Sequence, residues 1–226
     1  MEDEKTFLTN NEGMIVKKGV LKSYRGKDVH VIVPDGVTAI GARAFRKRFS
    51  VGSVTMPTGV KEIGKEAFRS CGAVSVRIPQ TVITAGKGAF WHCRKLTALT
   101  VPGSLEVLEK RFAAECEKLS TLVLEPGVKV IGPSAFFWCS ALSEVSVPEG
   151  VTEIGKEAFH GCFKLQSVLL PRSLQAIGRS AFGGCSRLVE LRFAGTVAEW
   201  RAVKKGVFWK GTRRDLVVQC ADGVAK

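Results

Sequence analysis

The sequence predicts a repeat solenoid, a superhelix of short stacked turns with a curved parallel β-sheet along its concave side. The first observation is a twelve-residue pattern that returns: residues 60 to 71 read VKEIGKEAFRSC and residues 151 to 162 read VTEIGKEAFHGC. The second is that further copies lie between and around these two at a nearly constant period. The third is that each copy ends in a short apolar alternation and none contains a long helical pattern.

Each unit begins at a proline or at its replacement, and the starts are Pro34, Pro57, Pro79, Pro102, Glu125, Pro148 and Pro171. Neighbouring starts lie 23 residues apart, except for 22 residues between Pro57 and Pro79. Seven units therefore occupy residues 34 to 193. A fixed period of this length, with leucine-like positions, predicts a leucine-rich-repeat superhelix.

Apolar residues occupy the same positions in almost every unit. A phenylalanine position holds Phe45, Phe68, Phe90, Ala113, Phe136, Phe159 and Phe182, and a cysteine position holds Arg48, Cys71, Cys93, Cys116, Cys139, Cys162 and Cys185. A glycine position holds Gly41, Gly64, Gly86, Glu109, Gly132, Gly155 and Gly178, and we interpret its glycine as part of a tight turn. One unit cannot bury its apolar side chains alone, so stacked units should form interior columns of rings and thiols.

Each unit ends in a predicted strand, such as LTALTVP (96 to 102), because apolar residues alternate and proline then ends the run. Equivalent strands one unit apart pair only in parallel, which predicts one long sheet on the concave side. The rest of each unit should return along the convex side as a short strand and one helical turn around its Ala-Phe pair. The fourth unit departs from the pattern, with Glu109 at the glycine position and the reversed pair Phe112-Ala113, and Glu-Pro-Gly follows it at 125 to 127.

The shared pattern, V-x-x-I-G-x-x-A-F-x-x-C-x-x-L-x-x-L-x-L-P, resembles the BspA-like, or Treponema pallidum-type, class of leucine-rich repeats over residues 34 to 193. The resemblance supports the solenoid with a cap at each end, and it implies binding of host extracellular-matrix proteins or bacterial contacts. Because an open solenoid exposes apolar side chains at its ends, we expect two caps. Residues 1–33 should form an N-terminal β-hairpin cap that turns at Lys18-Gly19. Residues 194–226 should form a C-terminal cap with a short helix, which Thr196 caps, and a last strand at 215–220.

The cysteines and the N-terminal residues bear on localisation. Six of the seven cysteines share one column, where we interpret them as free thiols that act as small hydrophobes and suit a reducing compartment. The start, MEDEKTFLTNN, has no apolar run of the length that a leader or a membrane span requires, so we expect no signal peptide and no transmembrane segment. The family resemblance points instead to an exported or surface protein, so the localisation stays open.

Residues suited to catalysis or metal binding do not converge. The three histidines, His30, His92 and His160, fall in different turns of the predicted superhelix. Cysteines recur once per unit, whereas zinc sites use pairs two to four residues apart. No phosphate-binding loop or dinucleotide motif follows a predicted strand. We therefore expect no enzyme activity, no metal and no cofactor.

The concave face is the first candidate binding surface. Its outward strand residues form one column of Ser53, Ser75, Ala98, Thr121, Glu144, Ser167 and Glu190, and a second of Thr55, Arg77, Thr100, Val123, Ser146, Leu169 and Arg192. These mostly small side chains leave a smooth floor that could admit a strand, loop or helix of a partner. The alternative is that exposed strand positions favour Ser and Thr for intrinsic reasons.

An aromatic patch is the second candidate surface. Between the phenylalanine and cysteine positions, where other units carry polar or small residues, the chain has Trp91, His92, Phe137, Trp138 and His160. Large rings at such positions indicate contact with a partner. The alternative is that the rings fold over the turn and shield the phenylalanine column.

Positive charge marks the third candidate surface, since 34 Lys and Arg against 21 Asp and Glu give a net charge of +13. The excess is arranged in one row of Lys65, Lys87, Lys110, Lys156 and Arg179 and another of Lys95, Lys118, Lys164 and Arg187. Stacked like charges repel one another, and an anionic partner would relieve that cost. The alternative is an ordinary solvated face, since Glu66, Glu117 and Glu157 beside the rows partly neutralise them.

Together these features predict a non-catalytic scaffold for protein–protein interaction, with bacterial adhesion or host-protein binding implied by the resemblance. The alternative is a basic module that binds a polyanion such as nucleic acid, glycosaminoglycan or anionic lipid. The sequence names neither the partner nor the oligomeric state, so a homo-oligomer also stays open.

Overall fold

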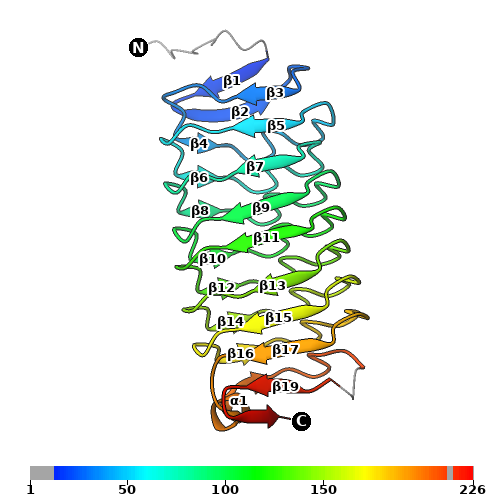
Figure 1. The fold of residues 1–226 in the computed structure, drawn as a ribbon. Coiled ribbons are helices and arrows are strands. Elements are labelled where there is room, and N and C mark those ends of the chain that lie inside the picture. The colour runs from blue at the N-terminus through cyan, green and yellow to red at the C-terminus, as the bar shows by residue number, and fades with distance from the viewer. Residues whose placement is uncertain (1–12, 213–215, 226) are drawn as a thin grey trace.

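In a computed structural model that describes residues 13–212 and 216–225, the chain winds into a solenoid whose turns stack in sequence order from one end to the other (Figure 1). Strands stack in parallel on two sides of the solenoid, and the described residues contain one short helix, near the C-terminal end. The predicted leucine-rich-repeat solenoid is thus confirmed. No helix within these described ranges is long and apolar enough to cross a membrane.

The longer strands form what we call the long-strand face. They are β3 (His30–Ile32), β5 (Ser53–Thr55), β7 (Ser75–Arg77), β9 (Ala98–Val101), β11 (Thr121–Leu124), β13 (Glu144–Ser146), β15 (Ser167–Leu170), β17 (Glu190–Phe193) and β19 (Val218–Cys220). Equivalent residues of neighbouring units pair side by side, as Ser167 does with Glu190. Because equivalent residues of successive units pair in this way, they line up in columns that run across the strands.

Shorter strands form a second side, the short-strand face. They are β4 (Ala39–Ile40), β6 (Glu62–Ile63), β8 (Thr84–Ala85), β10 (Val107–Leu108), β12 (Val130–Ile131), β14 (Glu153–Ile154), β16 (Ala176–Ile177) and β18 (Lys204–Lys205). Each begins close to the turn that follows the unit's first residue, and its last residue is buried except in β18.

Between the two faces lies one continuous apolar core. The phenylalanine column is present: the rings of Phe136, Phe159 and Phe182 stack at centroid distances of 5.4 and 5.5 Å. The column cysteines are buried and free. Their thiols donate to main-chain carbonyls of the preceding unit, as Cys162 does to the Phe136 oxygen at 3.4 Å. A cysteine therefore fills a small apolar space and also satisfies a buried acceptor.

The prediction of a helical turn around the Ala-Phe pair of each unit is wrong. Two successive turns replace it in each unit, and the residue in the middle of each turn has a positive φ, as at Ser134 (55°) and Trp138 (57°). Main-chain hydrogen bonds run between units here, from Phe136 N to Ala158 O at 2.8 Å, for example. These bonds alternate with turn bonds within the unit, such as Phe137 N to Ser134 O at 3.2 Å, so only every second amide bonds locally and no helix forms.

The N-terminal end is covered by a hairpin of β1 (Met14–Lys17) and β2 (Val20–Tyr24), which are antiparallel and turn at Lys18 and Gly19 with φ values of 48° and 71°. Strand β2 then pairs in parallel with β4, so the hairpin extends the short-strand face. The rest of the predicted N-terminal cap, at residues 1–12, lies outside the described residues, as does the start of the predicted last strand at Asp215.

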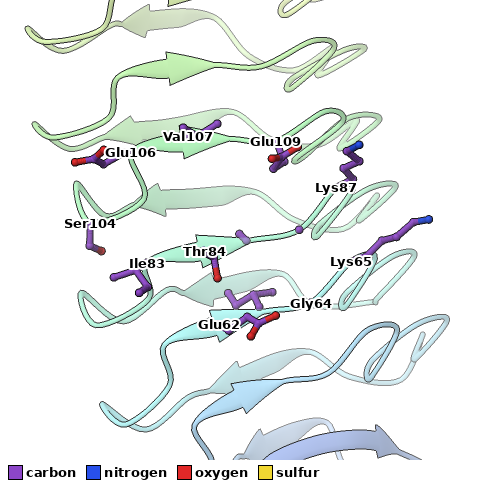
Figure 2. Close-up of a pocket in the computed structure, with 13 residues that line it drawn as sticks. Glu62, Gly64, Lys65, Ile83, Thr84, Lys87, Ser104, Glu106, Val107 and Glu109 are labelled. Carbon is purple, nitrogen blue, oxygen red and sulfur yellow. The ribbon is translucent and has the colours of Figure 1, made fainter.

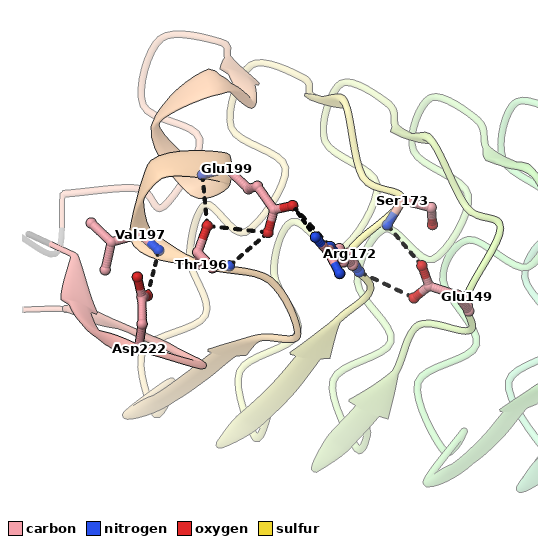
Figure 3. A network of polar contacts seen from close by, with 7 residues as sticks. All are labelled: Glu149, Arg172, Ser173, Thr196, Val197, Glu199 and Asp222. Carbon is pink, nitrogen blue, oxygen red and sulfur yellow. Dashed lines mark hydrogen bonds and ion pairs between the residues drawn. The ribbon is translucent and has the colours of Figure 1, made fainter.

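At the C-terminal end, helix α1 (Val197–Ala202) packs with β20 (Gly223–Ala225), which pairs with β19. The expected N-cap is confirmed, because Thr196 accepts from Glu199 N and the Glu199 carboxylate accepts in return from Thr196 N (Figure 3). Arg172 joins this cap to the last repeats: its guanidinium donates to Glu199 at 2.8 and 2.6 Å, while its main-chain N donates to Glu149. Figure 3 shows this network crossing from the repeats to the helix.

The prediction of one continuous sheet is wrong at the fourth unit. On the short-strand face, pairing is interrupted between β8 and β10, and on the long-strand face between β11 and β13. The ring of Phe112 also meets its neighbours edge-on, at 71° to Phe90 and 76° to Phe136, where the stacked pairs differ by 15° or less. The fourth unit is therefore paired to the preceding unit by its long strand and to the following unit by its short strand.

Candidate binding surfaces

The residues of both predicted concave columns lie on the long-strand face and alternate with core residues. In β15, for example, Val168 and Leu170 are buried while Leu169 is 44% exposed. The parallel register aligns Glu144 with Ser167 and Glu190, and Ser146 with Leu169 and Arg192. The alternation of the strands places the side chains outward, and the equal length of the units keeps them in line.

Two grooves lie in the C-terminal half of this face. One, of about 380 Å³, is lined by Leu122, Glu144, Val145, Ser146, Ser167, Val168, Leu169, Glu190 and Arg192. The other, of about 630 Å³, is lined by Val189, Glu190, Leu191, Arg192, Val217 and Gln219. They share Glu190 and Arg192, whose side chains form an ion pair at 2.5 Å. The first groove lies at the interruption between β11 and β13, and the irregular Glu-Pro-Gly sequence at 125 to 127 follows directly after β11.

The predicted aromatic patch is divided between two places. Trp91 lies beneath two guanidinium groups, with Arg69 3.9 Å and Arg111 5.0 Å from its ring centroid. His92 forms a hydrogen bond with Ser70 at 3.0 Å. The faces that a partner would meet at Trp91 are thus already covered by cationic side chains of the chain itself.

The remaining rings form a group that we call the aromatic cluster, which consists of Phe137, Trp138, His160 and Phe163. Phe137 stacks on His160 at 5.4 Å, and Trp138 meets Phe163 edge-on at 5.4 Å. Trp138 is 45% and Phe163 40% exposed. Phe163 was not among the residues predicted for the patch. Its position shows the same contrast between units, because every other unit except the first carries a polar residue or glycine there.

Local backbone geometry holds Trp138 at the surface. Its positive φ of 57° is uncommon for a bulky residue. The indole lies over Gly161, where an added Cβ would be only 2.4 Å from Trp138 Cδ1. A glycine in the next unit therefore makes room for the ring.

The two predicted basic rows are solvent-exposed and partly neutralised. Arg94, beside the second row, pairs with Glu117 at 3.0 Å, and Lys156 of the first row pairs with Glu157 at 3.5 Å. Glu66, the buried acidic residue in the N-terminal half, accepts from Arg43 and Arg69. Burial acts to raise the pKa of Glu66, but the hydrogen bonds from these two arginines outweigh it and lower the pKa. This carboxylate therefore stays charged and belongs to a structural network.

The chemistry of the cysteine column does not favour a nucleophile. Burial raises the pKa of the Cys71 thiol to about 11 and that of Cys185 to about 12. A thiol in this state is protonated at neutral pH and therefore unreactive. His30 lies on β3, far along the chain from the turns that hold His92 and His160. Within residues 13–212 and 216–225, no group of three or more His, Cys, Asp or Glu could hold a metal.

A family model for the BspA type leucine rich repeat region matches residues 24–139 and 109–210. No curated protein matches the chain. The two matched segments overlap and together span most of the sequence, including all seven predicted units.

Solved structures of bacterial leucine-rich repeat proteins are similar to this one. A Treponema pallidum protein has 27% identity and a TM-score of 0.59, with 92% of this chain and 88% of that chain covered. A Bacteroides ovatus protein has 19% identity and a TM-score of 0.60, with 92% and 67% covered. A leucine rich cell surface protein from Faecalibacterium prausnitzii has 22% identity and a TM-score of 0.45, with 77% of this chain and 62% of that chain covered, which is less than two thirds of its length. At 27% identity, this chain is a relative of the treponemal protein and not the same protein.

Proposed function

The chain belongs to the family of BspA-type leucine-rich repeat proteins, and from that premise we propose that it is a non-catalytic scaffold that binds another protein through the long-strand face. The observation that carries this proposal is the pair of adjoining grooves of about 380 and 630 Å³, which share Glu190 and Arg192. Leu169 and Val189, 44% and 68% exposed, place apolar surface within a polar surround. An apolar centre with a polar rim is the usual anatomy of a protein interface.

The family resemblance supports an extracellular-matrix protein or a bacterial surface protein as the partner. The aromatic cluster would be a second contact with the partner, because it lies on the turns of the two units that supply β13 and β15. Exposed Trp and Phe side chains are common anchors in interfaces, because they bury a large area with little loss of conformational entropy.

Binding of the chain to an immobilised set of extracellular-matrix proteins, at two salt concentrations, tests this proposal. The variant Leu169→Glu should lose binding at both salt concentrations, because it places a charge at the centre of the apolar contact. The control is Val207→Glu in the turn after β18, since Val207 is 63% exposed and lines neither groove of the long-strand face. Retained binding in Leu169→Glu, or equal loss in both variants, would contradict the use of the long-strand face.

The aromatic cluster is tested separately with Trp138→Ala. We expect weaker binding to the captured protein, or loss of self-association in sedimentation, with an unchanged circular dichroism spectrum. Unchanged behaviour in both assays would remove the cluster from the proposal.

A polyanion is the second candidate partner, and the observation in its favour is the row of Lys65, Lys87 and Lys110, for which no ion pair is found within the described residues. Retention on heparin should then fall with salt, and replacing the three lysines with glutamine should reduce the salt slope by about one unit per lost contact. Retention equal to that of a protein of the same net charge would count against it.

A further inference from the structure

Positive charge is unevenly distributed over the convex turns. We compare the seven residues of each unit that run from the first basic row to the cysteine position, for example residues 65–71 in the second unit. In the first four units these segments contain nine Lys and Arg against two Glu, whereas in the last three units they contain two against one. The first four segments therefore carry a net charge of +7, more than half of the +13 of the whole chain. We call their cationic residues the basic turn patch, which consists of Arg43, Arg46, Lys47, Arg48, Lys65, Arg69, Lys87, Lys110 and Arg111.

Hydrogen bonds between neighbouring turns make the patch continuous. Arg43 N donates to Lys65 O at 3.0 Å, which joins the first turn to the second. Gly88 N donates to Lys110 O at 3.0 Å, which joins the third turn to the fourth. Figure 2 shows the side chains of Lys65 and Lys87, which extend outward from two successive turns. At about 4.8 Å between turns, the four units spread their cations over roughly 15 Å.

Contacts inside the patch hold three of its guanidinium groups in place. Arg43 and Arg69 both donate to the buried Glu66, at 3.1 and 3.3 Å. Arg69 and Arg111, from the units on either side, also lie over the ring of Trp91. Glu66 is the one acidic group in these contacts, so the three arginines together keep a positive charge. Groups that are ordered before a ligand arrives lose less conformational entropy when they bind it.

The first turn contains donors for which the described residues supply no acceptor. Arg46 Nε and Arg48 Nε are buried without a hydrogen-bond partner within residues 13–212 and 216–225. In the same ranges no ion pair is found for Arg46, Lys47 or Arg48. Both arginine side chains are half-buried and Lys47 is exposed, so their nitrogens that reach solvent stay available to an anion.

These features favour a sulfated linear polysaccharide as the ligand. Guanidinium groups bind the oxygens of an oxyanion through paired, charge-assisted hydrogen bonds. A polysaccharide with closely spaced sulfates can contact several turns at once, because the cations recur at each turn. Such a ligand would also relieve the repulsion between cations that are stacked along the solenoid.

Nucleic acid fits the same features less well. Proteins hold single strands by stacking successive bases on free aromatic side chains. The ring of Trp91 is covered by Arg69 and Arg111, and Phe49, 63% exposed, offers one ring beside the patch. Duplex DNA is read by a helix or a β-ribbon in its major groove, whereas the patch consists of turns.

We propose that the basic turn patch is a binding site for a sulfated linear polysaccharide, separate from the long-strand face. The ligand lies along the stack of turns, and its sulfates contact guanidinium and ammonium groups of successive units. This inference rests on the second candidate function above, to which it assigns a location and one class of ligand.

Fluorescence anisotropy with a labelled heparin oligosaccharide tests this proposal. The variant Arg46→Gln/Lys47→Gln/Arg48→Gln removes three cations of the first turn, so the affinity should fall about tenfold. The slope of log affinity against log salt should become shallower by roughly two to three units, because three fewer contacts release counterions.

A matched control removes the same charge elsewhere. Lys95→Gln/Lys118→Gln/Lys164→Gln changes three exposed lysines of the second basic row, for which no ion pair is found within the described part of the chain. This variant should bind heparin within about twofold of the wild type, since salt screens charges that do not touch the ligand.

A second patch variant guards against misfolding, because Arg46 and Arg48 are half-buried. Lys47→Gln/Lys110→Gln/Arg111→Gln removes three cations whose side chains are exposed. It should weaken heparin binding to a similar extent, about tenfold, with an unchanged circular dichroism spectrum.

Equal weakening in the control and in the two patch variants would overturn the location, since the general field of the protein would then govern binding. Tighter binding of single-stranded DNA or of anionic lipid vesicles than of heparin, at the same salt concentration, would overturn the class of ligand. If the wild type bound heparin no better than a protein of the same net charge, the second candidate function itself would fail. Leu169→Glu should bind heparin normally, so a failure of the long-strand face remains distinguishable from a failure of the patch.

Discussion

Replacing Glu109 with glycine should restore pairing between β8 and β10 and make the protein more stable. The perturbation removes the one side chain that stands at the glycine position, where the other described units leave no space for a Cβ. Strand β10 could then move toward β8 and form the two missing hydrogen bonds, from Glu106 N to Ile83 O and from residue 109 N to Ala85 O. The interruption would close without any change in the core.

The magnitude follows from these two bonds. Each main-chain hydrogen bond adds about 1 kcal/mol of net stability, so the pair would contribute about 2 kcal/mol. Glycine loses more chain entropy on folding, which offsets about 0.5–1 kcal/mol. A net gain of about 1 kcal/mol corresponds to a rise in Tm of roughly 2–4 °C for a chain of this length.

Scanning calorimetry measures the gain, and amide hydrogen exchange locates it. The amides of residues 106 and 109 should exchange readily in the wild type and become protected in the variant, as those of Lys129 and Gly132 already should be. Glu109→Ala is the control, because alanine removes the charge and keeps the Cβ. A similar rise in Tm with alanine, or unchanged exchange at 106 and 109 in Glu109→Gly, would refute the role of the Cβ as a wedge.

Three further outcomes are expected. Gly132→Ala would place a Cβ 2.2 Å from Leu108 O and should lower the free energy of unfolding by about 2 kcal/mol or more, whereas Gly59→Ala, with 3.5 Å to Val37 O, should be nearly neutral in the same denaturant titration. Because burial raises the pKa of Cys71 from 9.0 to about 11 and of Cys185 to about 12, the stability that these thiols contribute is complete below pH 9 and is lost as the pH rises toward those values. The loss is about 1.4 kcal/mol per pH unit per thiol, so urea midpoints should fall above pH 9, and less steeply in Cys71→Ala; a flat profile would contradict this account. Thr196→Ala removes the 3.2 Å bond to Glu199 N and should destabilise by about 1 kcal/mol, while Thr196→Ser should not, as thermal unfolding would show.

The repeat period was sufficient to predict the architecture and the two strand columns. A solenoid requires the same side chain at the same place in each turn, so the spacing of Phe136, Phe159 and Phe182 translates directly into a stacked column. The N-terminal hairpin and the cap at Thr196 were also predictable, because turn and cap chemistry depends on a few adjacent residues.

The convex turns and the aromatic patch were less predictable. Every second amide of these turns bonds to the next unit where a helical turn was expected, and only the stacked structure brings those groups together. Trp91 was expected beside Trp138, but it is covered by Arg69 and Arg111 from neighbouring units. Phe163 joins Trp138 for the same reason, since rings from successive units meet through stacking.

By itself, the sequence determined that the chain repeats, which residues form the core, and which unit departs from the pattern. Only the tertiary structure decided what that departure does. Whether a Cβ at residue 109 is harmless or separates two strands depends on how near the preceding main chain lies, and at the intact glycine positions that distance leaves no room for it. Distances between turns arise from packing of the whole stack, so the grooves appear only after the units are assembled.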